Sequence, residues 1–240
     1  MQCVRFLHIP KTAGSTFERI LARQYDGVGH FGFSGDAAAD LGRFTHLSEQ
    51  EKGSIGLFTG HAPISTGISE ADKALIITFL RDPVHRVKSF CQHVAEGKSP
   101  YLSSDFPPDG FDLDKFINSG NLELSNLQTK MLINDRESAS SELIGRMSPS
   151  EARDRALENL FGKVSHFGLQ EFFNDSLLLF WKALAWSPPA YSSMDNQASD
   201  ELVVFKEHHL DHIKDLNSID IEVYSAAKTR FLYILEGFLG

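Results

Sequence analysis

A lysine and three hydroxyl side chains surround a single glycine near the start of the chain, in the segment Lys11-Thr12-Ala13-Gly14-Ser15-Thr16. Ammonium and hydroxyl groups donate hydrogen bonds to phosphate and sulfate oxygens, and a glycine lets the backbone close around such a group without a Cβ in the way. A turn alone does not require this set of donors. The segment therefore predicts an anion-binding loop in preference to a generic turn.

The elements on either side of this loop favour the same chemistry. An apolar run from Val4 to Ile9 has the composition of a strand and stops at Pro10, and residues 15–24 repeat apolar side chains with the period of a helix. The first N–H groups of a helix have no partner within it and lie at the positive end of its dipole. A strand, a tight loop and a helix N-terminus in this order therefore predict a phosphate cradle.

A second pair of candidate anion ligands follows the apolar run from Ala74 to Leu80. Such a run is typical of a central parallel strand, and ligands of parallel sheets gather at the carboxyl ends of strands. Arg81 comes directly after the run, and Ser89 lies eight residues later in a helix predicted to begin near Pro83. The guanidinium suits bidentate phosphate binding, and the serine adds a hydroxyl donor. Pairing with a nearby acid and an incidental helix position are the ordinary alternatives.

A candidate base lies between these two sites. His61 follows a short predicted strand, and an imidazole has a suitable pKa for removing a proton near neutral pH. A loop histidine that bonds to backbone is the alternative. Among the other histidines, His208, His209 and His212 lie near Asp211, but their spacing matches no familiar zinc pattern and favours a solvated helix face. The role of that cluster stays open.

The motif order leads to a family resemblance. In the common P-loop the lysine follows the last glycine, whereas Lys11 precedes Gly14. The segment Ile9 to Phe17 resembles the 5′-phosphosulfate loop of sulfotransferases that use 3′-phosphoadenosine 5′-phosphosulfate (PAPS), most of all the carbohydrate branch with its heparan 2-O- and 6-O-sulfotransferases and bacterial relatives. Arg81 and Ser89 resemble the 3′-phosphate site of this family, and His61 stands where the 2-O-like branch has its catalytic histidine.

Looser similarities to the family extend over most of the chain. They concern the segments Asn126 to Thr129, His166 to Glu171 and Ile219 to Tyr224, and a loop around Asn196 that is expected to fold over the nucleotide. No roles are assigned from them.

The resemblance implies an enzyme that moves a sulfuryl group from PAPS to a hydroxyl of a carbohydrate or other small acceptor, leaving adenosine 3′,5′-bisphosphate and requiring no metal. His61 would remove the acceptor proton and Lys11 would stabilise the leaving phosphate. The residues implied in cofactor binding are Lys11, Thr12, Ala13, Gly14, Ser15, Thr16, Arg81 and Ser89. The alternatives are a P-loop-type kinase, which the motif order disfavours, and a nucleotide-binding module without catalysis.

Alternating strands and helices predict one α/β domain over 1–240, with a P-loop-like central parallel sheet flanked by helices and a helix-rich C-terminal half. The resemblance implies the sulfotransferase fold. Residues 26–56 are expected to be irregular apart from a short helix near Ser48. With the loop 97–112 they are expected to shape the acceptor pocket. Four aromatic side chains of these segments are candidates for stacking on the acceptor or for packing: Phe31, Phe33, Tyr101 and Phe106.

Composition limits the partners. The chain of 240 residues carries a formal charge of −9, which argues against general binding to nucleic acid and mildly against a very anionic acceptor polymer. A chain with only two cysteines is not expected to depend on a disulfide framework. No apolar run reaches membrane-spanning length and no signal-peptide profile stands at the start, so we expect a soluble cytoplasmic protein of unspecified oligomeric state.

Overall fold

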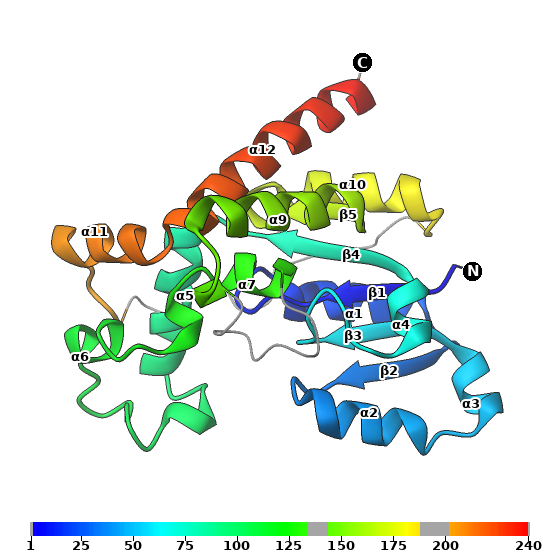
Figure 1. Ribbon diagram of the computed structural model, residues 1–240, viewed down its shortest axis with the longest axis horizontal. Helices are drawn as coiled ribbons and strands as arrows, with labels where there is room; N and C mark the ends of the chain where they lie inside the picture. Colours follow the sequence, from blue (N-terminus) through cyan, green and yellow to red (C-terminus); the bar gives the residue numbers. More distant parts are fainter. Residues whose placement is uncertain (1, 134–143, 188–201, 240) are drawn as a thin grey trace.

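The computed structural model of the chain describes residues 2–133, 144–187 and 202–239 (Figure 1). Asn196 and nearly all of the predicted loop 187–200 lie outside these residues. A five-stranded parallel sheet in the order β2-β3-β1-β4-β5 forms the centre of the molecule. Its strands are β1 (Val4–Leu7), β2 (Gly29–Phe33), β3 (Ile55–Gly60), β4 (Leu75–Leu80) and β5 (Val164–Leu169). The predicted α/β class with a parallel sheet is confirmed.

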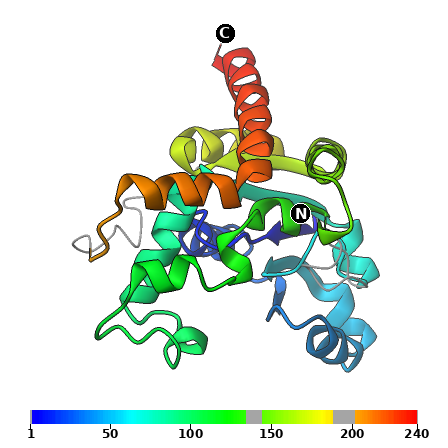
Figure 2. The ribbon, with the colours of Figure 1, turned by 60° about the vertical axis from the view of Figure 1, so that its left-hand side comes forward.

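Helices surround the sheet and dominate the C-terminal half. They are α1 (Gly14–Gln24), α2 (Ala37–Thr45), α3 (Glu49–Ser54), α4 (Ser69–Lys73), α5 (Pro83–Ala95), α6 (Leu113–Ile117), α7 (Leu127–Ile133), α9 (Pro149–Gly162), α10 (Phe173–Leu184), α11 (Glu207–Leu216) and α12 (Ser218–Leu239), with the 3-10 turns η1 (Pro100–Leu102), η2 (Leu122–Leu124) and η3 (Gln170–Phe172). The end of α12 extends beyond the rest of the molecule (Figures 1 and 2). Within the described residues, no helix combines the length and the apolar character needed to cross a membrane.

Alternation along the central strands divides the core between the two faces of the sheet. Phe6 of β1 and Phe79 of β4 pack with α1 and α10, whereas Leu7 and Leu80 pack with α7, α9 and α12. Because successive side chains of a strand point to opposite faces, a strand covered by helices on both faces must be apolar throughout. This requirement explains the continuous apolar run that predicted β4.

The prediction of an irregular segment over residues 26–56 is wrong. This segment contains the edge strand β2, and Asp36 caps the following helix α2 by accepting hydrogen bonds from the N–H groups of Ala38 and Ala39. Glycines at two of the five positions of β2 hide its strand character, but its two phenylalanines, Phe31 and Phe33, pack against Phe58 of β3. The predicted short helix near Ser48 is present as α3.

Candidate active site

The predicted anion-binding loop connects β1 to α1 with a strained backbone. Lys11 and Ala13 have φ angles of 69° and 70°, in the left-handed region that residues with a Cβ rarely adopt. Ala13 is the N-cap residue of α1, and its side chain cannot cap the first N–H groups of the helix. Lys11 and the segment 13–16 line a cavity of about 800 Å³. The loop therefore turns the N-terminus of α1 toward open space.

Thr12 and Gly14 serve this loop differently from what the sequence predicts. Thr12 is fully buried and its hydroxyl donates to the Ile9 carbonyl oxygen at 2.8 Å, so it closes the loop instead of offering its hydroxyl to the cavity. A Cβ on Gly14 would lie 1.9 Å from His8 Nε2. The neighbouring imidazole ring alone therefore requires a glycine at this position, which also lines the cavity.

The second predicted anion site opens onto the same cavity. Arg81 and Ser89 both line it, and Arg81 Nη1 donates to the carbonyl oxygen of Lys11 at 3.1 Å. Neighbouring parallel strands β1 and β4 bring the two loops together, since their carboxyl ends lie at the same edge of the sheet. The structure therefore places a lysine and an arginine side by side.

Two side chains from distant segments hold the end of β4. Gln128 accepts from the Arg81 N–H at 2.9 Å and donates to the Arg81 carbonyl oxygen at 2.8 Å. Glu171 accepts from the Asp82 N–H at 2.9 Å and from the Tyr224 hydroxyl at 2.8 Å. These backbone contacts fix the position from which the Arg81 side chain enters the cavity.

The segments with loose family similarity meet at this support. Asn126 accepts from the N–H groups of Ile219 and Asp220 at 3.1 and 3.0 Å. Asp220 in turn accepts from the N–H groups of Gln128 and Thr129 at 3.0 and 2.7 Å. The helices α7 and α12 thus cap each other, which places Gln128 against the end of β4.

The two cations lie close together in a partly dehydrated environment. Burial, followed by the charge of Arg81, lowers the pKa of Lys11 to about 8. Burial also lowers the pKa of Arg81, against the opposite influence of Glu171. In the described residues, neither cation has a carboxylate within ion-pairing distance, and the buried Arg81 Nε has no hydrogen-bond partner. A dianionic ligand would favour the charged forms of both side chains and would offer a hydrogen-bond acceptor to Arg81 Nε.

His61 lies at the end of β3 and lines the same cavity. Its Nδ1 lies 2.9 Å from the His8 carbonyl oxygen, and because a carbonyl only accepts, Nδ1 must carry the proton. Nε2 then keeps a lone pair. The ring is open to solvent, yet the surrounding protein, followed by the nearby His8, lowers its pKa. His61 is therefore neutral near pH 7, as a proton acceptor must be.

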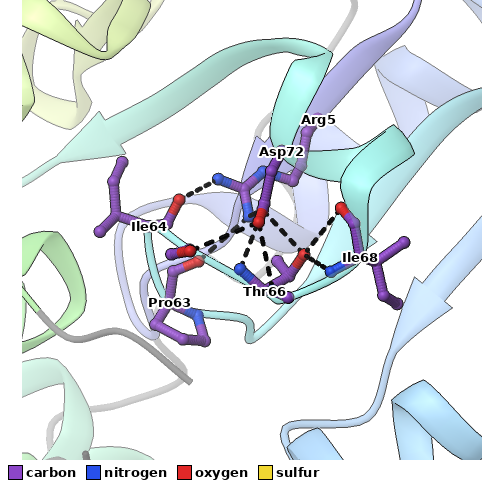
Figure 3. A network of polar contacts seen from close by, with 8 residues as sticks. Arg5, Pro63, Ile64, Thr66, Ile68 and Asp72 are labelled. Carbon is purple, nitrogen blue, oxygen red and sulfur yellow. Dashed lines mark hydrogen bonds and ion pairs between the residues drawn. The ribbon is translucent and has the colours of Figure 1, made fainter. Parts of the chain in front are cut away.

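A buried arginine anchors the loop that follows His61 (Figure 3). Arg5 of β1 donates to the carbonyl oxygens of Pro63 and Ile64 at 3.1 and 2.5 Å and pairs with Asp72 at 3.4 Å. Asp72 also accepts from the Thr66 N–H at 2.9 Å and from its hydroxyl at 2.8 Å. The backbone after His61 is thus tied to the central strand β1.

Comparison with known proteins finds curated proteins of similar sequence. No family model matches the chain. Heparan-sulfate 6-O-sulfotransferase 2 of Gallus gallus is 29% identical over 65% of this chain and 44% of its own length. The Homo sapiens protein of the same name is 28% identical over 65% of this chain and 29% of its own length. The chain is related to the carbohydrate branch of the sulfotransferases. It spans less than half the length of these curated relatives.

The cavity that holds these residues differs in part from the acceptor pocket that the sequence predicts. Residues 26–56 contribute no side chain to it, and Phe31, Phe33 and Phe106 are buried core residues. Tyr101 of η1 is 62% exposed and lines the cavity, so only the loop 97–112 shapes it as expected. His8, His85 and His93 line it as well.

The histidines of α11 form a link between helices. His209 is buried, contrary to the predicted solvated face, and its Nε2 lies 3.0 Å from an Asp114 oxygen of α6. His208 Nε2 lies 3.5 Å from the same oxygen, so the three groups are close enough to share a metal ion. However, His209 Nδ1 accepts from the Lys206 N–H at 3.1 Å, which places the proton on Nε2. A metal-binding Nε2 needs a lone pair, so this tautomer disfavours a metal.

Proposed function

We propose that the chain transfers a sulfuryl group from PAPS to a hydroxyl of a carbohydrate acceptor. The observation that carries this proposal is the convergence of Lys11, Arg81 and a neutral His61 on one cavity at the carboxyl edge of the sheet. Two cations without a paired carboxylate suit a ligand with two anionic ends. The relationship to carbohydrate sulfotransferases supports the same assignment.

The donor would be held by two groups of residues. The N–H groups at the start of α1, with Lys11 and Ser15, suit the 5′ end. Arg81 and Ser89 suit the 3′-phosphate, because the guanidinium offers several donors and Arg81 Nε has no partner among the described residues. When bound, PAPS supplies the sulfuryl group and a phosphate leaving group.

The side chains of this protein would then accept the proton of the acceptor hydroxyl and offset the charge of the leaving phosphate. His61 Nε2 accepts the proton of the acceptor hydroxyl while the acceptor oxygen forms its bond to sulfur. The bond between sulfur and the bridging phosphate oxygen breaks, and Lys11 offsets the charge that develops on that phosphate. The hydrogen bond to the His8 carbonyl keeps the Nδ1 proton in place and so directs Nε2 to act as the base.

Nucleotide binding provides the first test. Titration with adenosine 3′,5′-bisphosphate, followed by calorimetry, should give binding that ATP with Mg²⁺ does not match. A preference for ATP with Mg²⁺ would favour a kinase and refute the proposal. Transfer of labelled sulfate from PAPS to a panel of neutral and acidic oligosaccharides then separates an enzyme from a binding module without catalysis.

Substitution of the base provides the second test. His61→Asn keeps a donor for the His8 carbonyl oxygen but removes the basic nitrogen, so turnover should fall about 10²–10⁴-fold. Bisphosphate affinity should remain unchanged, which shows that the cavity is intact. His46→Ala, at the end of α2 and outside the cavity, is the matched control. Normal turnover of His61→Asn would mean that another group is the base.

A further inference from the structure

The short turn η2 is held by three side chains from three other parts of the fold. Lys130 Nζ donates to the Leu122 carbonyl oxygen at 3.0 Å, and Arg86 Nη2 donates to that of Glu123 at 2.5 Å. Asn217 Nδ2 donates to the carbonyl oxygen of the following residue, Leu124, at 2.8 Å. Three consecutive carbonyl groups of one turn are thus fixed from α7, α5 and the end of α11.

Two of the three side chains that hold η2 are charged and buried. Arg86 is fully buried, and Lys130 is only 5% exposed. Burying an ammonium or guanidinium is costly unless its donors are used. Arg86 Nε and Nη1 have no hydrogen-bond partner among the described residues, so the guanidinium is stabilised by its bond to the Glu123 carbonyl oxygen and by the nearby charge of Asp220. Such an arrangement serves to fix Glu123 in place.

The fixed residue presents its carboxylate to the cavity. Glu123 lines the cavity, and the hydroxyl of Tyr101, which also lines it, donates to Glu123 Oε1. The carboxylate is near enough to both Lys11 and His61 for its charge to raise their pKa values, against the larger lowering by burial. Lys11 and His61 flank the site of transfer in the proposed function. Because a carboxylate repels the anionic donor, the acceptor is the ligand that Glu123 can bind in this cavity.

We propose that Glu123, oriented by Tyr101, is an acceptor-binding residue that selects saccharides with neutral or amino groups next to the reacting hydroxyl and disfavours polyanionic ones. This inference rests on the proposed function and specifies its acceptor. An ionised carboxylate only accepts hydrogen bonds, so its ligand must donate from a hydroxyl, an amide or an ammonium group. A sulfate or uronate in the same place would be repelled by its like charge. The acceptor would then differ in charge from the heparan sulfate named in the relatives.

Matched tetrasaccharides test this selection. The probes are a neutral tetramer of N-acetylglucosamine, its de-N-acetylated cationic form, and a heparosan tetrasaccharide that alternates N-acetylglucosamine with glucuronate. We expect the unmodified chain to sulfate the neutral and cationic probes with a kcat/KM at least about tenfold above that for heparosan. Glu123→Gln, which keeps shape and the Tyr101 contact, should reduce this ratio about fivefold or more. Most of the change should lie in KM.

Two further variants make the result specific. Tyr101→Phe leaves the charge of Glu123 but removes its hydroxyl partner, so the ratio should change less than in Glu123→Gln. Glu158→Gln removes one exposed negative charge of α9 far from the cavity lining and should leave the ratio unchanged.

Each outcome has a defined meaning. A preference for heparosan or an unchanged ratio in Glu123→Gln would overturn this inference alone. Transfer to none of the probes despite bisphosphate binding would overturn both this inference and the proposed transfer to a carbohydrate. A uniform collapse of kcat in Glu123→Gln would also overturn it, because Glu123 would then be the base. Failure to bind adenosine 3′,5′-bisphosphate would overturn both this inference and the proposed function.

Discussion

The two ends of the cavity differ in the charge of the side chains that line them. At the donor end Lys11 and Arg81 lie side by side without an ion-paired carboxylate among the described residues. At the acceptor end a neutral imidazole, His61, and a carboxylate, Glu123, face the same space. The first arrangement calls for an anion, and the second calls for a group that gives up or donates a proton. Under the proposed function, the first end would bind the sulfuryl donor and the second end would bind the acceptor.

The ends also differ in how they are supported. The donor end depends on backbone: a strained loop, a helix N-terminus, and the strand end held by Gln128 and Glu171. The acceptor end depends on two buried arginines, Arg5 behind His61 and Arg86 behind Glu123. Changes at the acceptor supports should therefore cost folding stability, whereas changes to donor-end side chains should cost ligand affinity.

Removal of Arg5 should have the largest effect. Arg5→Met leaves Asp72 without its cation and two carbonyl groups without donors, and loss of one partner of a buried pair costs about 3–5 kcal/mol. The Asp72 side chain is 29% exposed, so we expect the lower end of this range. Chemical denaturation measures the free energy of unfolding.

A matched variant shows whether burial matters in this case. Arg155→Met removes an exposed arginine of α9 and should change the free energy of unfolding by less than about 0.5 kcal/mol. Equal stability of the Arg5 and Arg155 variants would contradict the idea that a buried arginine supports the acceptor end.

Removal of the Arg81 side chain should have the next largest effect, and on affinity. Arg81→Met should weaken bisphosphate binding about 100-fold, and Arg81→Lys about tenfold, because lysine keeps the charge but loses the bidentate geometry. Gln128 contacts only the backbone of Arg81, so the fold should persist. Calorimetric titration measures affinity. Unchanged binding in Arg81→Met would exclude this residue from the donor end.

The pH dependence of nucleotide binding should be smaller and should arise at Lys11. Its pKa is about 8 in the free protein, and a bound anion would raise it. Below pH 8 Lys11 is already charged, so it should contribute no change in affinity. Above pH 8 binding must take up a proton, so affinity should fall by up to about tenfold per pH unit.

Calorimetry between pH 6.5 and 9.5, in buffers of different ionisation enthalpy, measures both affinity and proton uptake. Lys11→Arg keeps the charge over this range and should abolish the proton uptake. Proton uptake that persists in Lys11→Arg would assign the effect to another group.

The convergence of Lys11 and Arg81 on one cavity could be predicted from sequence because both residues lie in local motifs. Lys11 and the helix start lie within a few residues of one another, and Arg81 directly follows an apolar strand. The rule that parallel strands end at one edge then brings the two motifs together. The strand β2 was missed for a local reason, because its glycines weaken the pattern of its phenylalanines.

Unlike His61, Glu123 could not be predicted in the same way, because its contacts span long stretches of sequence. Glu123 meets Tyr101 from 22 residues away and Arg86 from 37. The periodic patterns of apolar residues that predict helices and strands do not indicate such contacts. Arg5 alone left a local signal: a charge inside the apolar strand Val4–Leu7 must find a partner when the strand is buried.

The smallest expected effect concerns Glu18, which contacts His8, the imidazole next to His61. Glu18 Oε1 lies 3.0 Å from His8 Nδ1, and the His8 ring contacts that of His61. Burial and then His8 lower the pKa of His61, and the Glu18 charge acts in the opposite direction. Glu18→Gln keeps an acceptor for His8 but removes this charge, so the pKa of His61 should fall further. Because the base must be neutral, the acidic limb of kcat/KM should move to lower pH by less than about half a unit, measured between pH 5 and 7 with Glu158→Gln as the control. A shift to higher pH would mean that Glu18 does not act on the base through its charge.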